Sequence, residues 1–185
     1  MDEFQIIQLI REVTSSYFPQ PHPFPTDDDA AQIAAINHQA IISVDALEED
    51  IHFPAEASPF LIGYRAVAVA VSDLAAMGAR PRGCFLSLSL PHKNHSHKNH
   101  PHKNRPHKNH SDKNCKNDFI KDLAAGFGLA ASRVAMPLLG GNIIQGKSCG
   151  LSVTVIGDGN QCLGRRGAKG IQVGDAIYVS GFLGD

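Results

Sequence analysis

The stretch LIGYRAVAVAVSDLAAMGARP, residues 61–81, decides the fold because it predicts one long and mostly apolar helix. Apolar side chains recur in it at steps of three and four residues, which is the spacing of one helix face. Asp73 lies on that same face, among residues typical of a protein core. Gly78 stands where a helix stop is expected, and Pro81 follows it. A carboxylate on an apolar face is costly unless a cation faces it, so we expect a metal ion beside Asp73.

The length and composition of the chain are typical of one globular domain. Its 185 residues are 43% hydrophobic and 19% charged, which suffices for a sizeable core. We expect no apolar run to reach the length of a membrane span, and the first residues, MDEF, carry acids where a signal peptide carries basic residues. The four cysteines are scattered without a C-x-x-C pair, which favours a reducing compartment over a disulfide framework. We therefore expect a cytoplasmic protein that does not enter a membrane.

Residues 92–116 form a low-complexity insert of five pentapeptides, most of which begin with HKN. The insert holds seven of the ten histidines and a net charge of +6, whereas the rest of the chain carries −7. An acidic globular part favours cation binding and argues against nucleic acid as a partner. The insert has no apolar side chains for a core, so we expect a disordered loop. It is either a metal-binding tract or, as we favour, a repeat expansion that a surface loop tolerates.

The remaining patterns predict an α+β fold. An amphipathic helix is expected at residues 2–14 and a further helix at 118–133. Strands are expected at residues 83–90, 134–139, 151–156 and 176–180. Short apolar runs at residues 31–36 and 40–45 flank Asn37-His38-Gln39 and predict a hairpin, followed by an acidic loop over 46–58. This order mixes hairpins with crossover helices. It indicates a single domain, residues 1–185, in which helices cover one side of a mixed β-sheet.

Several acidic or polar residues end or interrupt the apolar elements. They are Asp28 and Asp29, Ser43 and Asp45, Asp73, and Asn142. Hard oxygen ligands supplied from different elements suit Mg²⁺, which keeps bound waters and shares substrate phosphates. Such a site stabilises the charge of a transferring phosphoryl group. The alternative is that residues 27–29 form a solvated turn or helix cap, and that Asp45 merely ends a strand.

Residues 141–148, GNIIQGKS, match the P-loop pattern G-x-x-x-x-G-K-[ST]. That motif binds phosphate only when a helix begins at its Lys-Ser, because the loop amides and the helix N-terminus act together. Here Lys147 and Ser148 lead into CGLSVTVIG, which predicts a strand. We therefore do not expect a P-loop, and a P-loop nucleotidase remains only an alternative.

Six motifs follow one another along the chain. They are TDDDAA (26–31), ISVDALEEDIHF (42–53), IGYRAVAVAVSDLAAMGARP (62–81), LSLSLP (86–91), LLGGN (138–142) and GRRGAK…GDAIYVSGFLGD (164–185). In this order they resemble the thiamine-monophosphate kinase family of the aminoimidazole-ribonucleotide synthetase superfamily. The resemblance implies the fold of that superfamily's N-terminal domain and transfer of the γ-phosphoryl of ATP to thiamine monophosphate, giving thiamine diphosphate. It also implies several Mg²⁺ ions and a homodimer that pairs its N-terminal sheets.

The resemblance also implies roles for individual residues, none of them a covalent catalyst. The implied metal ligands are Asp29, Ser43, Asp45, Asp73 and Asn142, with Asp28 as a weaker candidate. The implied ATP contacts are Gly141, Asn142 and Arg165. His52 would contact the thiamine phosphate.

The chain also departs from the family pattern. Asp27 replaces a glycine before the paired acids, Val44 replaces a threonine, and Asp50 replaces a glycine two residues before His52. The family continues beyond the motif that ends at Asp185 into a second domain, so we expect this chain to represent the N-terminal domain alone. Two alternatives stay open: a non-enzymatic fragment that dimerises, and a superfamily member that acts on another phosphate acceptor.

Overall fold

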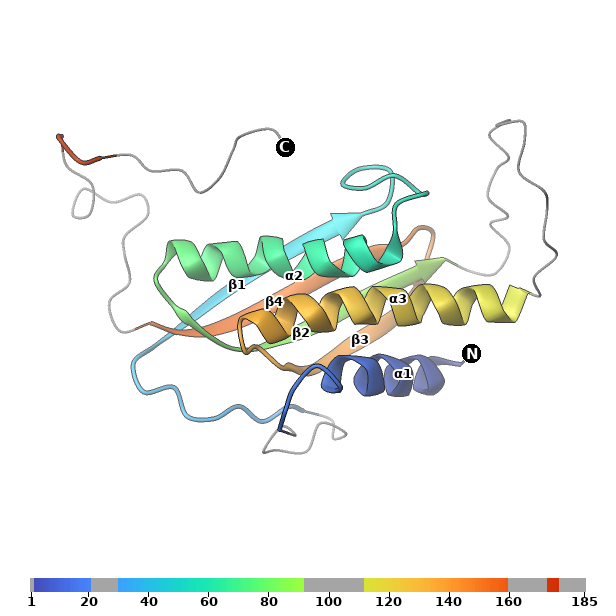
Figure 1. Ribbon diagram of the computed structural model, residues 1–185, viewed down its shortest axis with the longest axis horizontal. Coiled ribbons are helices and arrows are strands. Elements are labelled where there is room, and N and C mark those ends of the chain that lie inside the picture. The colour runs from blue at the N-terminus through green and yellow to red at the C-terminus, as the bar shows by residue number, and fades with distance from the viewer. Residues whose placement is uncertain (1, 21–29, 92–111, 160–172, 177–185) are drawn as a thin grey trace.

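In the part of the chain that the structure describes, three helices lie on one face of a four-stranded sheet (Figure 1). The computed structural model of the chain describes residues 2–20, 30–91, 112–159 and 173–176. The strand order is β1-β4-β2-β3, in which β4 is antiparallel to both its neighbours and β3 is parallel to β2. The sheet is therefore mixed and covered by helices on one side, which confirms the predicted α+β fold.

The helices begin and end where local signals place them. Helix α1 spans Glu3–Ser15 and starts with a capping box between Asp2 and Gln5. Helix α2 spans Pro59–Ala76, with proline in its first turn, and Gly78 follows it in the left-handed conformation at φ 66°. Helix α3 spans Asp112–Arg133. The predicted long apolar helix and its glycine stop are thus confirmed.

The strands alternate between a face that packs on the helices and a face that does not. They are β1 (Gln39–Glu48), β2 (Arg80–Pro91), β3 (Leu138–Gly146) and β4 (Gly150–Gly159). In β2, Leu86 and Leu88 are buried against the helices, whereas the side chain of Ser87 points the other way. We call this second side of the sheet, which carries Ile42, Val44, Ser87 and Ser152, the open face.

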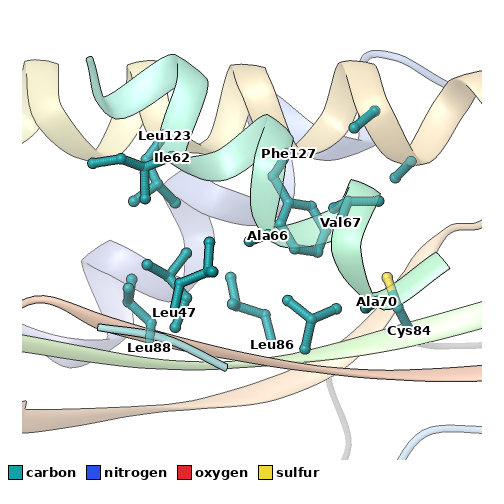
Figure 2. Packing of buried hydrophobic residues seen from close by; sticks show 14 of the residues in the cluster. Leu47, Ile62, Ala66, Val67, Ala70, Cys84, Leu86, Leu88, Leu123 and Phe127 are labelled. Carbon is teal, nitrogen blue, oxygen red and sulfur yellow. The ribbon is translucent and has the colours of Figure 1, made fainter. Parts of the chain in front are cut away.

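The core lies between the sheet and the pair of helices α2 and α3. Figure 2 shows Leu47, Leu86 and Leu88 of the sheet beneath Ile62 and Val67 of α2, with side chains of α3 completing the layer.

Helices α2 and α3 approach closely because each carries a glycine at the contact. A Cβ atom on Gly63 would lie 2.0 Å from the carbonyl oxygen of Leu123, and one on Gly126 would lie 1.9 Å from that of Phe60. The backbones therefore touch directly, and this contact fixes the position of α2 and its Asp73 over the sheet.

Some element boundaries were predicted incorrectly. The hairpin over residues 31–45 is wrong: residues 31–36 have no regular structure, and β1 runs on past Asp45 to Glu48. The strand expected at 134–139 is also wrong, because β3 starts at Leu138 and contains the Gly-Gly-Asn sequence that was expected to follow it. The last pentapeptide of the insert, 112–116, belongs to α3. Residues 92–111 and most of the strand expected at 176–180 lie outside the described residues.

Within the described residues, α2 is long and apolar enough to cross a membrane by length and composition alone. The expectation that no run reaches this length is therefore wrong. A core helix passes the same test, and α2 packs its buried face on the sheet and on α3. Its apolar character is accounted for by that packing.

Candidate metal and nucleotide site

Ser43 and Asp73 form the centre of the candidate site. Alternation along β1 turns Ile41, Ser43, Asp45 and Leu47 toward the helices, and α2 carries Asp73 above them. The hydroxyl of Ser43 donates a hydrogen bond of 2.6 Å to Oδ2 of Asp73. Asp45 lies two residues further along the same face and, like the other two, is partly exposed. Two distant segments thus place oxygen atoms in one region of the molecule.

This donor set fits Mg²⁺ by its chemistry. Its members are carboxylates and a hydroxyl, hard oxygen ligands with no thiol or imidazole among them. Among the residues that the structure describes, no three His, Cys, Asp or Glu side chains are close enough to hold an ion by themselves. Mg²⁺ is usually bound through one or two carboxylates and completes its shell with water and phosphate oxygens, so a pair of acids is a sufficient protein contribution. The predicted ligand Asp29, and Asp28 beside it, lie outside the described residues.

Gly141 and Asn142 lie on β3, at the opposite edge of the sheet. Asn142 pairs with Ser87, so its side chain lies on the open face, whereas Ser43 and Asp45 face the helices. Three strand spacings separate β3 from β1, on the order of 14 Å. Within one chain, the structure therefore brings Ser43 and Asp73 together, with Asp45 on the same face of β1, and places Gly141 and Asn142 apart from them. Arg165 lies outside the described residues.

A cleft of about 890 Å³ opens beside Gly141 and Asn142. Side chains of α1, among them Phe4 and Ile7, form one wall, and Ala30 is also in contact with the cleft. Its volume lies in the range of small-molecule sites. A Cβ atom on Gly141 would lie 2.0 Å from the carbonyl oxygen of Leu86, so only glycine allows the two strands to approach this closely. The cleft is thus lined both by the predicted ATP contacts Gly141 and Asn142 and by Ala30, the residue that directly follows Asp29.

His52 lies in a turn between β1 and α2. Its ring Nδ1 is 3.0 Å from the backbone nitrogen of Glu48, and Arg65 donates a hydrogen bond of 2.8 Å to its carbonyl oxygen. Asp50, in the same turn, has φ of 63°, a left-handed conformation that favours glycine. The side chain of His52 is exposed and available to a ligand.

Sequence reasoning missed a buried carboxylate at the far end of β4. Only 7% of the Asp158 side chain is exposed, and it contacts His38 Nδ1 at 3.0 Å and the Arg82 guanidinium at 3.1 Å. The backbone N–H of Asn37 also donates to it. Burial alone would raise the pKa of Asp158, but these hydrogen bonds outweigh it and lower the pKa. Asp158 therefore holds the segment that leads into β1 against the sheet.

The two cysteines whose side chains the structure describes, Cys84 and Cys149, are not arranged as nucleophiles. Burial raises the pKa of the Cys84 thiol far above its ordinary value. Burial, and then the charges of Glu49 and Glu48, raise the pKa of Cys149 to about 12. Both are free thiols and stay protonated at neutral pH.

The segment that resembles a P-loop does not have the structure of one. Residues 141–146 lie in β3, and β4 begins at Gly150, directly after Lys147-Ser148-Cys149. A strand stands where the motif requires a helix, as the sequence predicted.

Comparison with known proteins decides the family. Residues 27–158 match the family model described as AIR synthase related protein, N-terminal domain. The chain belongs to this family. As an AIR synthase related domain, it is similar throughout its length to thiamine-monophosphate kinases, of which that of Bacillus subtilis strain 168 is 32% identical over 189 residues. The match covers all of this chain and 50% of the relative.

Solved structures show the same AIR synthase related fold. The thiamine-monophosphate kinase of Stenotrophomonas maltophilia K279a superposes with a TM-score of 0.61 at 32% identity, covering 85% of this chain and 42% of that chain. The Aquifex aeolicus enzyme complexed with AMPPCP and TMP superposes with a TM-score of 0.58 over 90% of this chain and 45% of that one; at 24% identity it supports the fold. The chain spans about half the length of the curated relatives that it matches.

Proposed function

We propose that the chain is the nucleotide- and metal-binding part of a thiamine-phosphate kinase, which phosphorylates thiamine monophosphate with ATP to give thiamine diphosphate. The hydrogen bond between Ser43 and Asp73, with Asp45 on the same face, carries the proposal. It supports the proposal because two oxygen-bearing side chains, 30 positions apart in the sequence, meet in the folded chain. We infer the identity of the substrate, thiamine monophosphate, from the similarity to thiamine-monophosphate kinases.

The proposed roles follow the geometry. Asp29, Ser43, Asp45 and Asp73 would hold Mg²⁺, which supplies positive charge to the phosphates during transfer. The cleft beside Gly141 and Asn142 supports a nucleotide there, with Asn142 as a further metal contact and Arg165 as a further ATP contact. The protein contributes position and charge, because phosphoryl transfer needs no covalent intermediate.

We also propose that two copies pair through the open face of the sheet. Ile42 and Val44 of β1 are 60% and 59% exposed there, and Ile144 of β3 is 49% exposed. Among the described residues no helix covers this face, which leaves apolar side chains in water. A Val44→Lys variant should sediment as a monomer, and an Asp118→Lys change on the exposed side of α3 should leave the dimer intact. Monomeric wild-type protein would contradict the pairing.

The kinase activity is tested by thiamine diphosphate formation from thiamine monophosphate and MgATP. We expect turnover by the wild-type chain and its loss in Asp73→Asn. A folded chain that dimerises without turnover at high protein concentration would favour the non-enzymatic fragment instead. Turnover with another phosphate acceptor, and none with thiamine monophosphate, would favour a different superfamily activity.

Free buried thiols and the enzymatic role are consistent with the cytoplasmic location that we propose.

A further inference from the structure

The turn that presents His52 is fixed by the backbone on both sides. The carbonyl oxygen of Glu48 accepts hydrogen bonds from the N–H groups of Ile51 (3.2 Å) and His52 (2.8 Å), and the Asp50 N–H donates to the Phe53 carbonyl oxygen at 2.8 Å. Phe53 is only 7% exposed and anchors the turn in the core. His52 therefore projects from a defined loop, and its side chain is exposed to solvent. The loop between β1 and α2 is visible in Figure 1.

The hydrogen bond to the ring sets the tautomer of His52. A backbone N–H can only donate, so Nδ1, 3.0 Å from the Glu48 nitrogen, must accept and carry no proton. The neutral ring then has its proton on Nε2, the atom on the other side of the imidazole. In this arrangement His52 offers an N–H donor, which is the group that a phosphate oxygen requires.

Arg65 holds the same residue from helix α2. Arg65 lies thirteen positions after His52 in the chain, and its guanidinium donates a hydrogen bond of 2.8 Å to the His52 carbonyl oxygen. The turn is otherwise acidic, because Glu48, Glu49 and Asp50 directly precede Ile51 and His52. The charge of Arg65 beside His52 offsets these acids for an approaching anion.

We propose that Arg65 is a positioning residue that holds His52 as a neutral Nε2–H donor to the phosphate of the substrate. The inference rests on the proposed function, which makes that substrate thiamine monophosphate. Arg65 acts through the backbone of His52. The proposed Nε2–H form makes His52 a hydrogen-bond donor, and a ring that carries its proton on Nε2 cannot act as a general base through that atom.

Nitrogen-15 NMR of the histidine rings tests the tautomer, with the His52 signals assigned by a His52→Gln variant. We expect the Nε2–H form in the wild-type chain and a mixture of tautomers in Arg65→Gln. Arg65→Lys should restore most of the Nε2–H form because a lysine keeps the donor and the charge. The exposed Arg80→Gln is the matched control and should not change the spectrum. An Nδ1–H ring in the wild type, or an unchanged ring in Arg65→Gln, would overturn the inference.

Binding of thiamine monophosphate separates this inference from the kinase proposal. Titration should shift the His52 ring signals in the wild-type chain, and Arg65→Gln should weaken binding about tenfold while Arg80→Gln does not. If thiamine monophosphate binds but is not phosphorylated, the result would contradict the kinase proposal and still support the positioning role of Arg65. Turnover with an equal KM in Arg65→Gln, or no shift of His52 on titration, would remove the role of Arg65.

Discussion

The side chains of Ser43 and Asp73 meet across 30 positions of sequence, with 2.6 Å between the hydroxyl and the carboxylate oxygen. One residue lies on an edge strand and the other near the C-terminal end of an apolar helix. Such a contact orients the carboxylate, because a serine hydroxyl fixes one of its two oxygens. The pair joins the sheet layer to the helix layer at the point where we place the metal ion.

Removing either member of this pair should weaken binding of Mg²⁺. We expect Asp73→Asn to abolish measurable binding and Ser43→Ala to weaken it by at least roughly 10-fold to 100-fold, the range for groups that orient a metal ligand, because Ser43 both orients Asp73 and is itself a proposed ligand. Titration with Mn²⁺ followed by electron paramagnetic resonance measures the effect. Asp118→Asn, an exposed acid on α3, is the control and should bind like the wild type. Equal affinity in Asp73→Asn and in this control would place the ion elsewhere.

Glycine at the two left-handed positions should stabilise the fold. Asp50 and Ala135 have φ of 63° and 52°, a conformation that costs an L-residue about 1–2 kcal/mol. After the extra backbone entropy of glycine is subtracted, we expect Ala135→Gly to raise the free energy of unfolding by about 0.5–1 kcal/mol. Asp50→Gly should gain less, since aspartate tolerates this region better than alanine.

Chemical denaturation measures these changes, with Ala75→Gly as the control. Ala75 is exposed in helix α2, so glycine there should lower the free energy of unfolding by about 1 kcal/mol. Destabilisation by all three substitutions would show that the two positive φ angles are not strained.

Asp158 should make stability fall in acid. Its pKa in the folded chain lies below the ordinary value of 3.8, so the unfolded chain binds the proton more tightly. The contribution of Asp158 is therefore complete at pH values well above 4 and is lost as the pH falls through the folded pKa. We expect Asp158→Asn to destabilise the chain at pH 7 and to lose that disadvantage progressively as the pH falls below the ordinary pKa of an aspartate. Urea denaturation over this range measures it, and a difference that stays constant with pH would contradict the prediction.

The contact between α2 and α3 should not accept a methyl group. In Gly63→Ala the new Cβ would lie 2.0 Å from the Leu123 carbonyl oxygen, so the helices must separate. We expect a loss of about 3 kcal/mol in the free energy of unfolding, at the upper end for overpacking. Gly140→Ala is the matched control, because its Cβ would lie 3.5 Å from the Phe85 ring, an ordinary contact. Similar melting temperatures for the two variants would disprove the close approach.

Lys147 should not be needed for nucleotide binding. It lies in the short connection between β3 and β4 and has no helix behind it to complete a phosphate site. We expect Lys147→Ala to bind a fluorescent ATP analogue as the wild type does. A loss of binding of tenfold or more would revive the P-loop alternative.

Sequence periodicity predicted helix α2 and its stop because one face of that helix is apolar throughout and a left-handed glycine ends it. The same logic failed at β1. The apolar run at residues 40–45 was interpreted as half of a hairpin, but it belongs to β1, whose Ile42 and Val44 lie exposed on the open face. At β3 the predicted strand ended too early. The pattern predicts the end of a strand at Gly140 and Gly141, but they lie within β3.

The candidate site was predictable only where an acid interrupts an apolar pattern. Asp73 stands out on its helix face, and the structure places Ser43 against it. Asp158 gave no such signal, because it lies among glycines and its partners His38 and Arg82 are 120 and 76 positions away. Tertiary structure alone shows that it is buried, and the same holds for the contact between Arg65 and the turn of His52.

The strand order also determines when the sheet can assemble during synthesis. Strand β1 is made first, and its neighbour β4 is made last, with the contact between His38 and Asp158 closing a loop of 120 positions. A ribosome adds roughly 5–20 residues per second, so β1 waits on the order of 10 s for its neighbour. Until then its apolar side chains are unprotected, and every repeat added between residues 92 and 111 lengthens the wait.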